Sequence, residues 1–257
     1  MKNATTHPTS ESIWNAYHQN WLHTSTNTLY GLFHEHDGKR LRGFSLKKQD
    51  ISHILPQKDP EEVTAIHFIL GADDNKVCPF VTVCLGTHSR RHSVLQPILS
   101  SADEKPFIEH GASSIPYQFM QNLCQNWLLA DNLTLAQSFE AVIGGDTGVG
   151  AYRRLNQYVL TAGNVNQALF DFMVNGRHNL TALDLYFGLD KNKWGDYARF
   201  GFSIVVACHY TSQQPDEVLR GIAMRGVKVM KAEPDAGVDS GYVALFEYIS
   251  PCPPTCQ

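Results

Sequence analysis

The sequence has little charge and no long apolar run. Charged side chains make up 18% of its 257 residues, whereas an average soluble protein is about one quarter charged. Its formal net charge of −4 is spread over both halves, and no basic cluster forms the positive surface that a polyanion needs. No stretch approaches the roughly 18 uninterrupted apolar residues of a membrane-spanning helix. Neither nucleic acid nor a membrane is therefore an expected partner.

The beginning of the sequence has no apolar run either. Residues 1–12 are polar, with Lys2 as their single basic residue. A secretory signal peptide would place an apolar segment behind its basic residues. No signal peptide is predicted, and the cytoplasm is the expected location.

Cysteine is too sparse for a disulfide-based scaffold in a chain of this size. Cys84 and Cys208 end equivalent apolar strand patterns, and a free cysteine behaves as a small apolar side chain. Buried thiols are therefore expected. The six cysteines are Cys78, Cys84, Cys124, Cys208, Cys252 and Cys256.

The common catalytic signatures are missing as well. The sequence contains neither a Gly-x-Ser-x-Gly nucleophile elbow nor a His-Glu-x-x-His zinc motif. The glycine-rich segment 144–150 lacks the Lys-Ser/Thr ending of a phosphate-binding loop, and its Asp146 would repel phosphate. This segment is predicted to connect two strands. The sequence names no reaction, and an enzyme is not the leading expectation.

What the sequence does contain is an internal repeat. Gln-Asn-Trp-Leu occurs at 19–22 and again at 125–128, and residues 64–76 resemble residues 181–193. A repeat of this length predicts a tandem duplication, with residues 1–110 as the first unit and 111–257 as the second. Matching positions then serve the shared fold, and differing positions are where function could lie.

Each unit is predicted to begin with an amphipathic helix, at 12–22 and 117–128, whose apolar side chains recur at helical spacing. Trp21 and Trp127 are expected to be core anchors. Asn20 and Asn126 are expected to bond buried backbone groups.

The segments after these helices predict strands and short helices. Thr28 to Ser45 resembles a hairpin turning at Asp37-Gly38. Short helices follow at 47–55 and 164–173, then strand pairs at 66–70 with 80–84 and at 183–187 with 203–208, and a last strand at 241–248. His88 to His110 and the terminal segment 251–257 are expected to be irregular, because prolines interrupt them. The predicted class is α+β, with two tandem related units, each made of an N-terminal helix, a short second helix and antiparallel strands.

This order of elements resembles a family of small uncharacterised bacterial proteins of about one such unit. Leu185-Tyr186-Phe187-Gly188-Leu189-Asp190 and the tail Pro251-Cys252-Pro253-Pro254-Thr255-Cys256 carry the likeness. The first unit departs from the pattern, because it has Leu70 and Ala72 in place of the second aromatic residue and the Leu, and no such tail. The resemblance implies the fold and the importance of the tail, and it implies no activity.

No cofactor is expected, and the alternative is zinc. Several side chains could bind such a metal ion. His34 and His36 share one face if their segment is extended, and His88 and His92 would align on a helix. Cys252 and Cys256 could form a disulfide, supply thiolates to zinc, or remain free, since their spacing is not Cys-x-x-Cys.

The leading functional hypothesis is a non-catalytic module for protein binding or assembly, acting through a protein partner or self-association. The aromatic connection of the second unit, with Trp194, Tyr197 and Phe200, would supply the contacts together with the cysteine tail. One alternative is a metal-binding protein or metal-dependent enzyme using His34 and His36. Another is a small-ligand carrier with a pocket between the two units.

Overall fold

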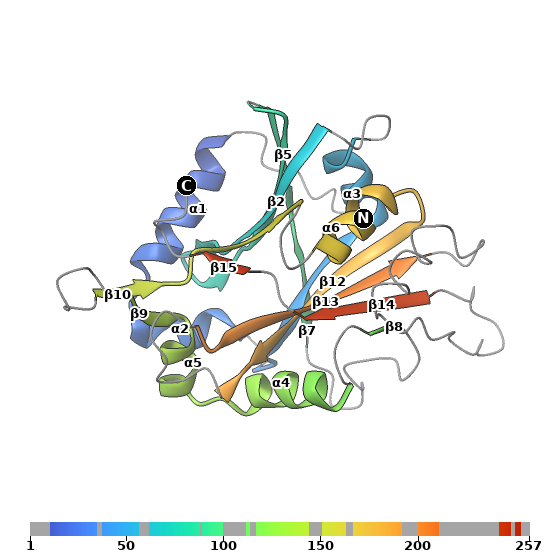
Figure 1. The fold of residues 1–257 in the computed structure, drawn as a ribbon. Helices are drawn as coiled ribbons and strands as arrows, with labels where there is room; N and C mark the ends of the chain where they lie inside the picture. Colours follow the sequence, from blue (N-terminus) through green and yellow to red (C-terminus); the bar gives the residue numbers. More distant parts are fainter. Residues whose placement is uncertain are drawn as a thin grey trace, which may run out of the picture.

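The computed structural model has an α+β fold (Figure 1). It describes residues 11–34, 38–56, 62–87, 89–99, 112–113, 117–143, 151–162, 167–191, 200–210, 242–247 and 250–252. The helices in these ranges are α1 (Glu11–His23), α2 (Thr26–Leu32), α3 (Lys48–Ile54), α4 (Tyr117–Leu129), α5 (Asn132–Ser138) and α6 (Gln167–Asn175). None of these described helices is long and apolar enough to cross a membrane.

The four helices predicted from the spacing of apolar residues are confirmed. The two long helices are α1 and α4, and the two short ones are α3 and α6. The hairpin predicted for residues 28–45 is wrong in its first arm, which is the helix α2. Leu29, Leu32 and Phe33 are buried at helical spacing, and this pattern prevails over the alternation of Tyr30 with Leu32. In place of a full hairpin, a single antiparallel bridge joins His34 to Arg40, and Gly38 between them has a φ of 81°.

Most strands belong to two sheets. The six-stranded sheet has the order β7-β1-β12-β13-β14-β8, and the five-stranded sheet has the order β15-β11-β2-β5-β6. β3 with β4 and β9 with β10 form small two-stranded sheets. The strands are β1 (Leu41–Lys47), β2 (Val63–Ile69), β3 (Ala72–Asp73), β4 (Lys76–Val77), β5 (Phe80–Leu85), β6 (Ser89–Val94), β7 (Gln96–Leu99), β8 (Ala112–Ser113), β9 (Glu140–Ile143), β10 (Ala151–Arg154), β11 (Gln157–Thr161), β12 (Leu180–Leu189), β13 (Phe202–Tyr210), β14 (Tyr242–Glu247) and β15 (Ser250–Cys252).

The two halves of the chain exchange strands. β1 pairs with β12 of the second half, and β11 pairs with β2 of the first half, both antiparallel. The registers match, because Phe44 lies opposite Leu185 just as Tyr158 lies opposite Phe68. The predicted strand pairs are confirmed as β2 with β5 and β12 with β13. Each main sheet therefore contains strands from both sides of residue 110.

Two regions expected to be irregular form strands at sheet edges. β6 continues into β7 with only Leu95 between them, so the chain passes from the five-stranded sheet to the six-stranded one. β14 and β15 make the reverse passage. Pro97 lies opposite Phe44 and Pro251 opposite Tyr158, both in outermost strands. An edge strand tolerates proline because its outer backbone groups have no ladder partner.

The core lies between the two sheets and contains side chains from both halves. Phe33 and Phe139 stack near the middle, with ring centroids 5.4 Å apart and planes within 5°. Trp21 and Trp127 are fully buried around this pair, as predicted for core anchors. In Figure 1, α1 lies over the outer face of the five-stranded sheet and α4 over that of the six-stranded sheet.

Candidate functional site

The polar groups that recur in both halves hold the halves together. Trp21 Nε1 donates a 2.8 Å hydrogen bond to the Leu155 carbonyl oxygen, and Trp127 Nε1 donates one of the same length to Leu41. Each indole therefore satisfies a buried carbonyl group in the other half. These recurrent groups are engaged in the fold and are not available to a ligand.

Arg40 reaches from the first half to the end of α4. Its guanidinium donates to the carbonyl oxygens of Trp127, Leu128 and Ala130, the last two at 3.1 and 2.8 Å. The ends of helices expose carbonyl groups that need such partners. Burial lowers the pKa of Arg40, but it remains charged at neutral pH.

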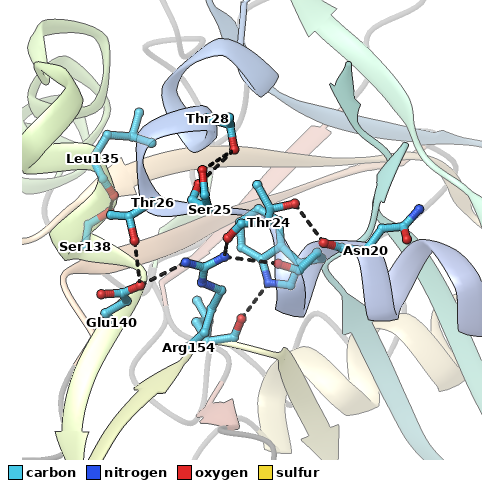
Figure 2. A network of polar contacts seen from close by, with 11 residues as sticks. Asn20, Thr24, Ser25, Thr26, Thr28, Leu135, Ser138, Glu140 and Arg154 are labelled. Atoms are coloured by element: carbon cyan, nitrogen blue, oxygen red, sulfur yellow. Dashed lines mark hydrogen bonds and ion pairs between the residues drawn. The ribbon is translucent and has the colours of Figure 1, made fainter. Parts of the chain in front are cut away.

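Arg154 has the same role for α1 (Figure 2). It donates to the carbonyl oxygens of Trp21 and Thr24, and its other terminal nitrogen donates to Glu140 Oε1 at 2.9 Å. The sequence carried a signal for this pair, because Arg-Leu-x-x-aromatic occurs at 40–44 and again at 154–158. Sequence reasoning missed it because the contacts link opposite halves.

The predicted metal residues do not meet in the described structure. His34 Nδ1 lies 2.9 Å from the Tyr30 carbonyl oxygen, whereas His92 belongs to β6. Across the ranges that the structure describes, no group of three or more His, Cys, Asp or Glu side chains is placed to hold a metal ion. His36, His88 and Cys256 lie outside the described residues, as does the side chain of Cys252.

A hollow of about 460 Å³ lies where the first residue of α1 meets β6. Pockets for small ligands measure about 300–1,000 Å³. The hollow combines a cation, an anion, an imidazole and hydroxyl groups. Its lining consists of Glu11, Thr87, Ser89, Arg90 and His92.

The imidazole of His92 is fixed from two sides. Its Nδ1 is 2.8 Å from Thr82 Oγ1, and its ring stacks on Trp14 with centroids 5.8 Å apart. Trp14 is itself packed on Phe80 at 4.8 Å. With Nδ1 engaged, Nε2 is the nitrogen that remains for a ligand.

The charges around the hollow influence His92. Burial lowers the pKa of His92; the carboxylate of Glu11 opposes this effect, and the guanidinium of Arg90 reinforces it. The net pKa lies below the ordinary value, so the imidazole is neutral near pH 7. A neutral ring can donate or accept a hydrogen bond, depending on its tautomer.

His67 and Cys84 lie near His92 on the same face of the five-stranded sheet. His67 lies opposite Thr82 in the register, and its Nδ1 is 3.0 Å from Gln157 Oε1. Burial lowers the pKa of His67 and raises that of Cys84. Because a thiolate is the nucleophilic form of cysteine, a thiol with a raised pKa does not suit covalent catalysis.

This polar site is specific to one half of the chain. The registers of β5 with β6 and of β13 with β14 give the corresponding positions in the other half, and these carry apolar residues. The hollow therefore follows the expectation that function lies where the halves differ. The corresponding pairs are His92 and Leu245, Arg90 and Val243, Thr82 and Ala207, and Trp14 and Met120.

The six-stranded sheet carries a different polar pair. His209 Nε2 donates to Asp184 Oδ2 at 2.8 Å, and both side chains are largely buried. Burial raises the pKa of Asp184, but the hydrogen bond from His209, the neighbouring Ser45 hydroxyl and the charge of Lys47 outweigh it. The net pKa of Asp184 lies below its ordinary value, so this carboxylate is charged at neutral pH.

The predicted interaction residues are only partly described. Phe200 is 3% exposed and belongs to the core, so its ring does not lie on the surface as expected. Trp194 and Tyr197 lie outside the described residues. Leu129 and Leu133, which sequence reasoning missed, are 73% and 66% exposed.

Comparison with known proteins yields no relative of this chain. No protein-family model matches the sequence, and no curated protein and no solved structure matches it. The resemblance to the family of small bacterial proteins stays a prediction.

Proposed function

We propose that the protein is a non-catalytic binding protein whose binding site is the hollow between the start of α1 and β6. One observation carries the proposal: the hollow gathers a fixed imidazole and two opposite charges, and these three side chains occur in one half only. The other half has the apolar Leu245 and Val243 at the positions of His92 and Arg90, and the uncharged Tyr117 at that of Glu11. The shared fold does not require this polarity.

The chemistry of the site supports binding more than catalysis. A nucleophilic mechanism needs a nucleophile beside a base that a third group orients. Here the Nδ1 of His92 contacts Thr82, and burial keeps Cys84 in its thiol form at neutral pH. A fixed neutral imidazole beside two charges suits the positioning of a ligand.

The test replaces Arg90 and His92 with the residues of the other half, as Arg90→Val with His92→Leu. Purified protein is dialysed against an extract of small metabolites, and retained compounds are identified by mass spectrometry. We expect the wild-type protein to retain a compound that the double variant loses.

The matched control is Arg153→Val with His178→Leu, which removes the same side chains from exposed positions outside the hollow. The control should retain the compound. Equal retention by the wild-type protein and both double variants would contradict the proposal, provided that all three have the same circular dichroism.

A second candidate function is self-association, which the exposed pair Leu129 and Leu133 favours. By the offset of the repeat, the first half has the polar residues His23 and Asn27 at these positions. A second copy could cover the pair in a twofold contact, in which the same patch meets itself.

Light scattering tests this candidate over a range of protein concentrations. Self-association should appear as a mass above that of one chain, and Leu129→Gln with Leu133→Gln should abolish it. Asn132→Gln, an exposed change between the two leucines, is the control. A monomer at all concentrations would contradict this candidate and leave the ligand hypothesis intact.

We further propose that the two halves arose by tandem duplication and that the protein acts in the cytoplasm. The exchanged strands support the first statement, as do the reciprocal contacts of the two tryptophans and two arginines. The absence of a basic cluster from the sequence supports a ligand other than nucleic acid.

A further inference from the structure

We propose that the hollow binds a small zwitterion, with the anionic group of the ligand at Arg90 and its ammonium group at Glu11. This inference rests on the proposed binding function and adds the chemical class of the ligand. Its basis is that two opposite charges line one hollow, together with neutral hydrogen-bonding groups.

Both charges are available to a ligand. Within the part of the chain that the structure describes, neither the Glu11 carboxylate nor the Arg90 guanidinium makes a hydrogen bond or an ion pair. The planar guanidinium of arginine matches a carboxylate or phosphate with two parallel hydrogen bonds. A glutamate carboxylate accepts the hydrogen bonds of an ammonium group.

The two charges also limit which ligands fit. A ligand with only anionic groups would be attracted by Arg90 and repelled by Glu11. A ligand with only cationic groups would be attracted by Glu11 and repelled by Arg90. The remaining lining groups are neutral, because Thr87 and Ser89 are hydroxyl residues and the pKa of His92 is lowered. Among the residues that the structure describes, the lining has no net charge, and a zwitterion matches both of its signs.

The other half offers an internal comparison for this reasoning. Tyr117 begins α4 where Glu11 begins α1, and Val243 corresponds to Arg90. Both charges are thus specific to the same half.

The test uses a series of amino acids with increasing separation of their charges: glycine, 4-aminobutyrate and 6-aminohexanoate. Butyrate and butylamine match the middle member in size and carry one charge each. Calorimetry measures affinity, and the imidazole resonances of His92 report the location. At least one amino acid should shift these resonances and bind at least about tenfold more tightly than either single-charge probe, a difference of roughly 1.4 kcal/mol.

Charge reversal makes the assignment specific. Glu11→Arg and Arg90→Glu should each abolish binding of the amino acid, and the double variant with both changes should restore it, because the ligand can then bind in the opposite orientation. Arg153→Glu, an exposed arginine outside the hollow, is the control and should bind like wild type.

Two results would overturn the inference, and they differ in what they leave standing. If butyrate binds as tightly as 4-aminobutyrate and depends on Arg90, the hollow binds anions, so the binding function stands and the zwitterion does not. If no probe shifts the His92 resonances and the metabolite dialysis also yields nothing, both proposals fail.

Discussion

At the scale of single residues, several largely buried polar side chains follow one rule: each is paired with a specific group distant in sequence. Asn126 Nδ2 donates to the Leu189 carbonyl oxygen at 3.1 Å, as predicted for a residue beside a core tryptophan. Asn20 is exposed instead, so the same prediction is wrong for the first half; there His18 Nδ1 lies 3.1 Å from the Leu70 carbonyl oxygen. In both halves a polar side chain of the long helix satisfies a backbone carbonyl at the end of a strand, but the two carbonyls are not at equivalent positions.

Asp184 makes this rule testable by pH. Its pKa is lower in the folded chain than in the unfolded chain, so it contributes stability above the ordinary carboxylate pKa of about 4. That contribution is lost as the pH falls through the lowered pKa. Asp184→Asn should therefore reduce the free energy of unfolding by about 1–3 kcal/mol at pH 7, the usual cost of breaking a buried hydrogen bond to a charge.

Urea unfolding of both proteins between pH 7 and pH 3 measures the effect. The difference between wild type and Asp184→Asn should be constant near neutrality and should shrink below about pH 4. Asp74→Asn, an exposed change, is the control. A difference that stays constant down to pH 3 would show that the carboxylate charge of Asp184 does not stabilise the fold.

At the scale of helices and strands, periodicity was a sufficient guide where one face of an element is buried. The alternation of residues 66–70 and 183–187 gave the buried faces of β2 and β12 correctly, because side chains alternate between the two faces of a strand. The structure also explains why glycine recurs at positions 71 and 188. A Cβ at Gly71 would lie 2.5 Å from the Cys78 carbonyl oxygen and 3.2 Å from Tyr17 Cβ, and one at Gly188 would lie 2.9 Å from Leu123 Cβ. Each glycine lets the long helix of its half lie close to the sheet.

Where periodicity failed, the missing information was a contact distant in sequence. α2 was mistaken for a strand because its short apolar pattern fits both periods, and burial against the second half decided it. β7 and β15 were not predicted because proline argues against an inner strand, and nothing local indicates that a strand will lie at an edge. The hollow was also missed, because Glu11 and Arg90 belong to elements far apart in the sequence and come together only in the fold.

At the scale of the whole molecule, the halves depend on each other. Neither set of strands forms a complete sheet, because β1 requires β12 and β11 requires β2. The main core cluster draws on both halves. The boundary predicted at residue 110 stays a statement about the sequence repeat, since the sheets cross it.

This dependence predicts how the halves behave when separated. Residues 1–110 or 111–257 alone would expose the partner-facing edges of their strands and the apolar surroundings of Phe33 or Phe139. We expect neither half to form a monomer that unfolds cooperatively. When both are produced together, the exchanged strands should pair and give a one-to-one complex with the circular dichroism of the intact chain. Size-exclusion chromatography with light scattering and thermal denaturation measure these outcomes.

A variant distinguishes specific pairing from nonspecific association of two apolar fragments. A Cβ at Gly43 would lie 2.0 Å from the Leu185 carbonyl oxygen, so Gly43→Val blocks the pairing of β1 with β12. It should prevent the halves from forming a complex, whereas Gly31→Ala, where a Cβ meets nothing within 4 Å, should permit it. A folded, monomeric half would refute the dependence, because a half that folds alone does not need the exchanged strand to complete its sheet.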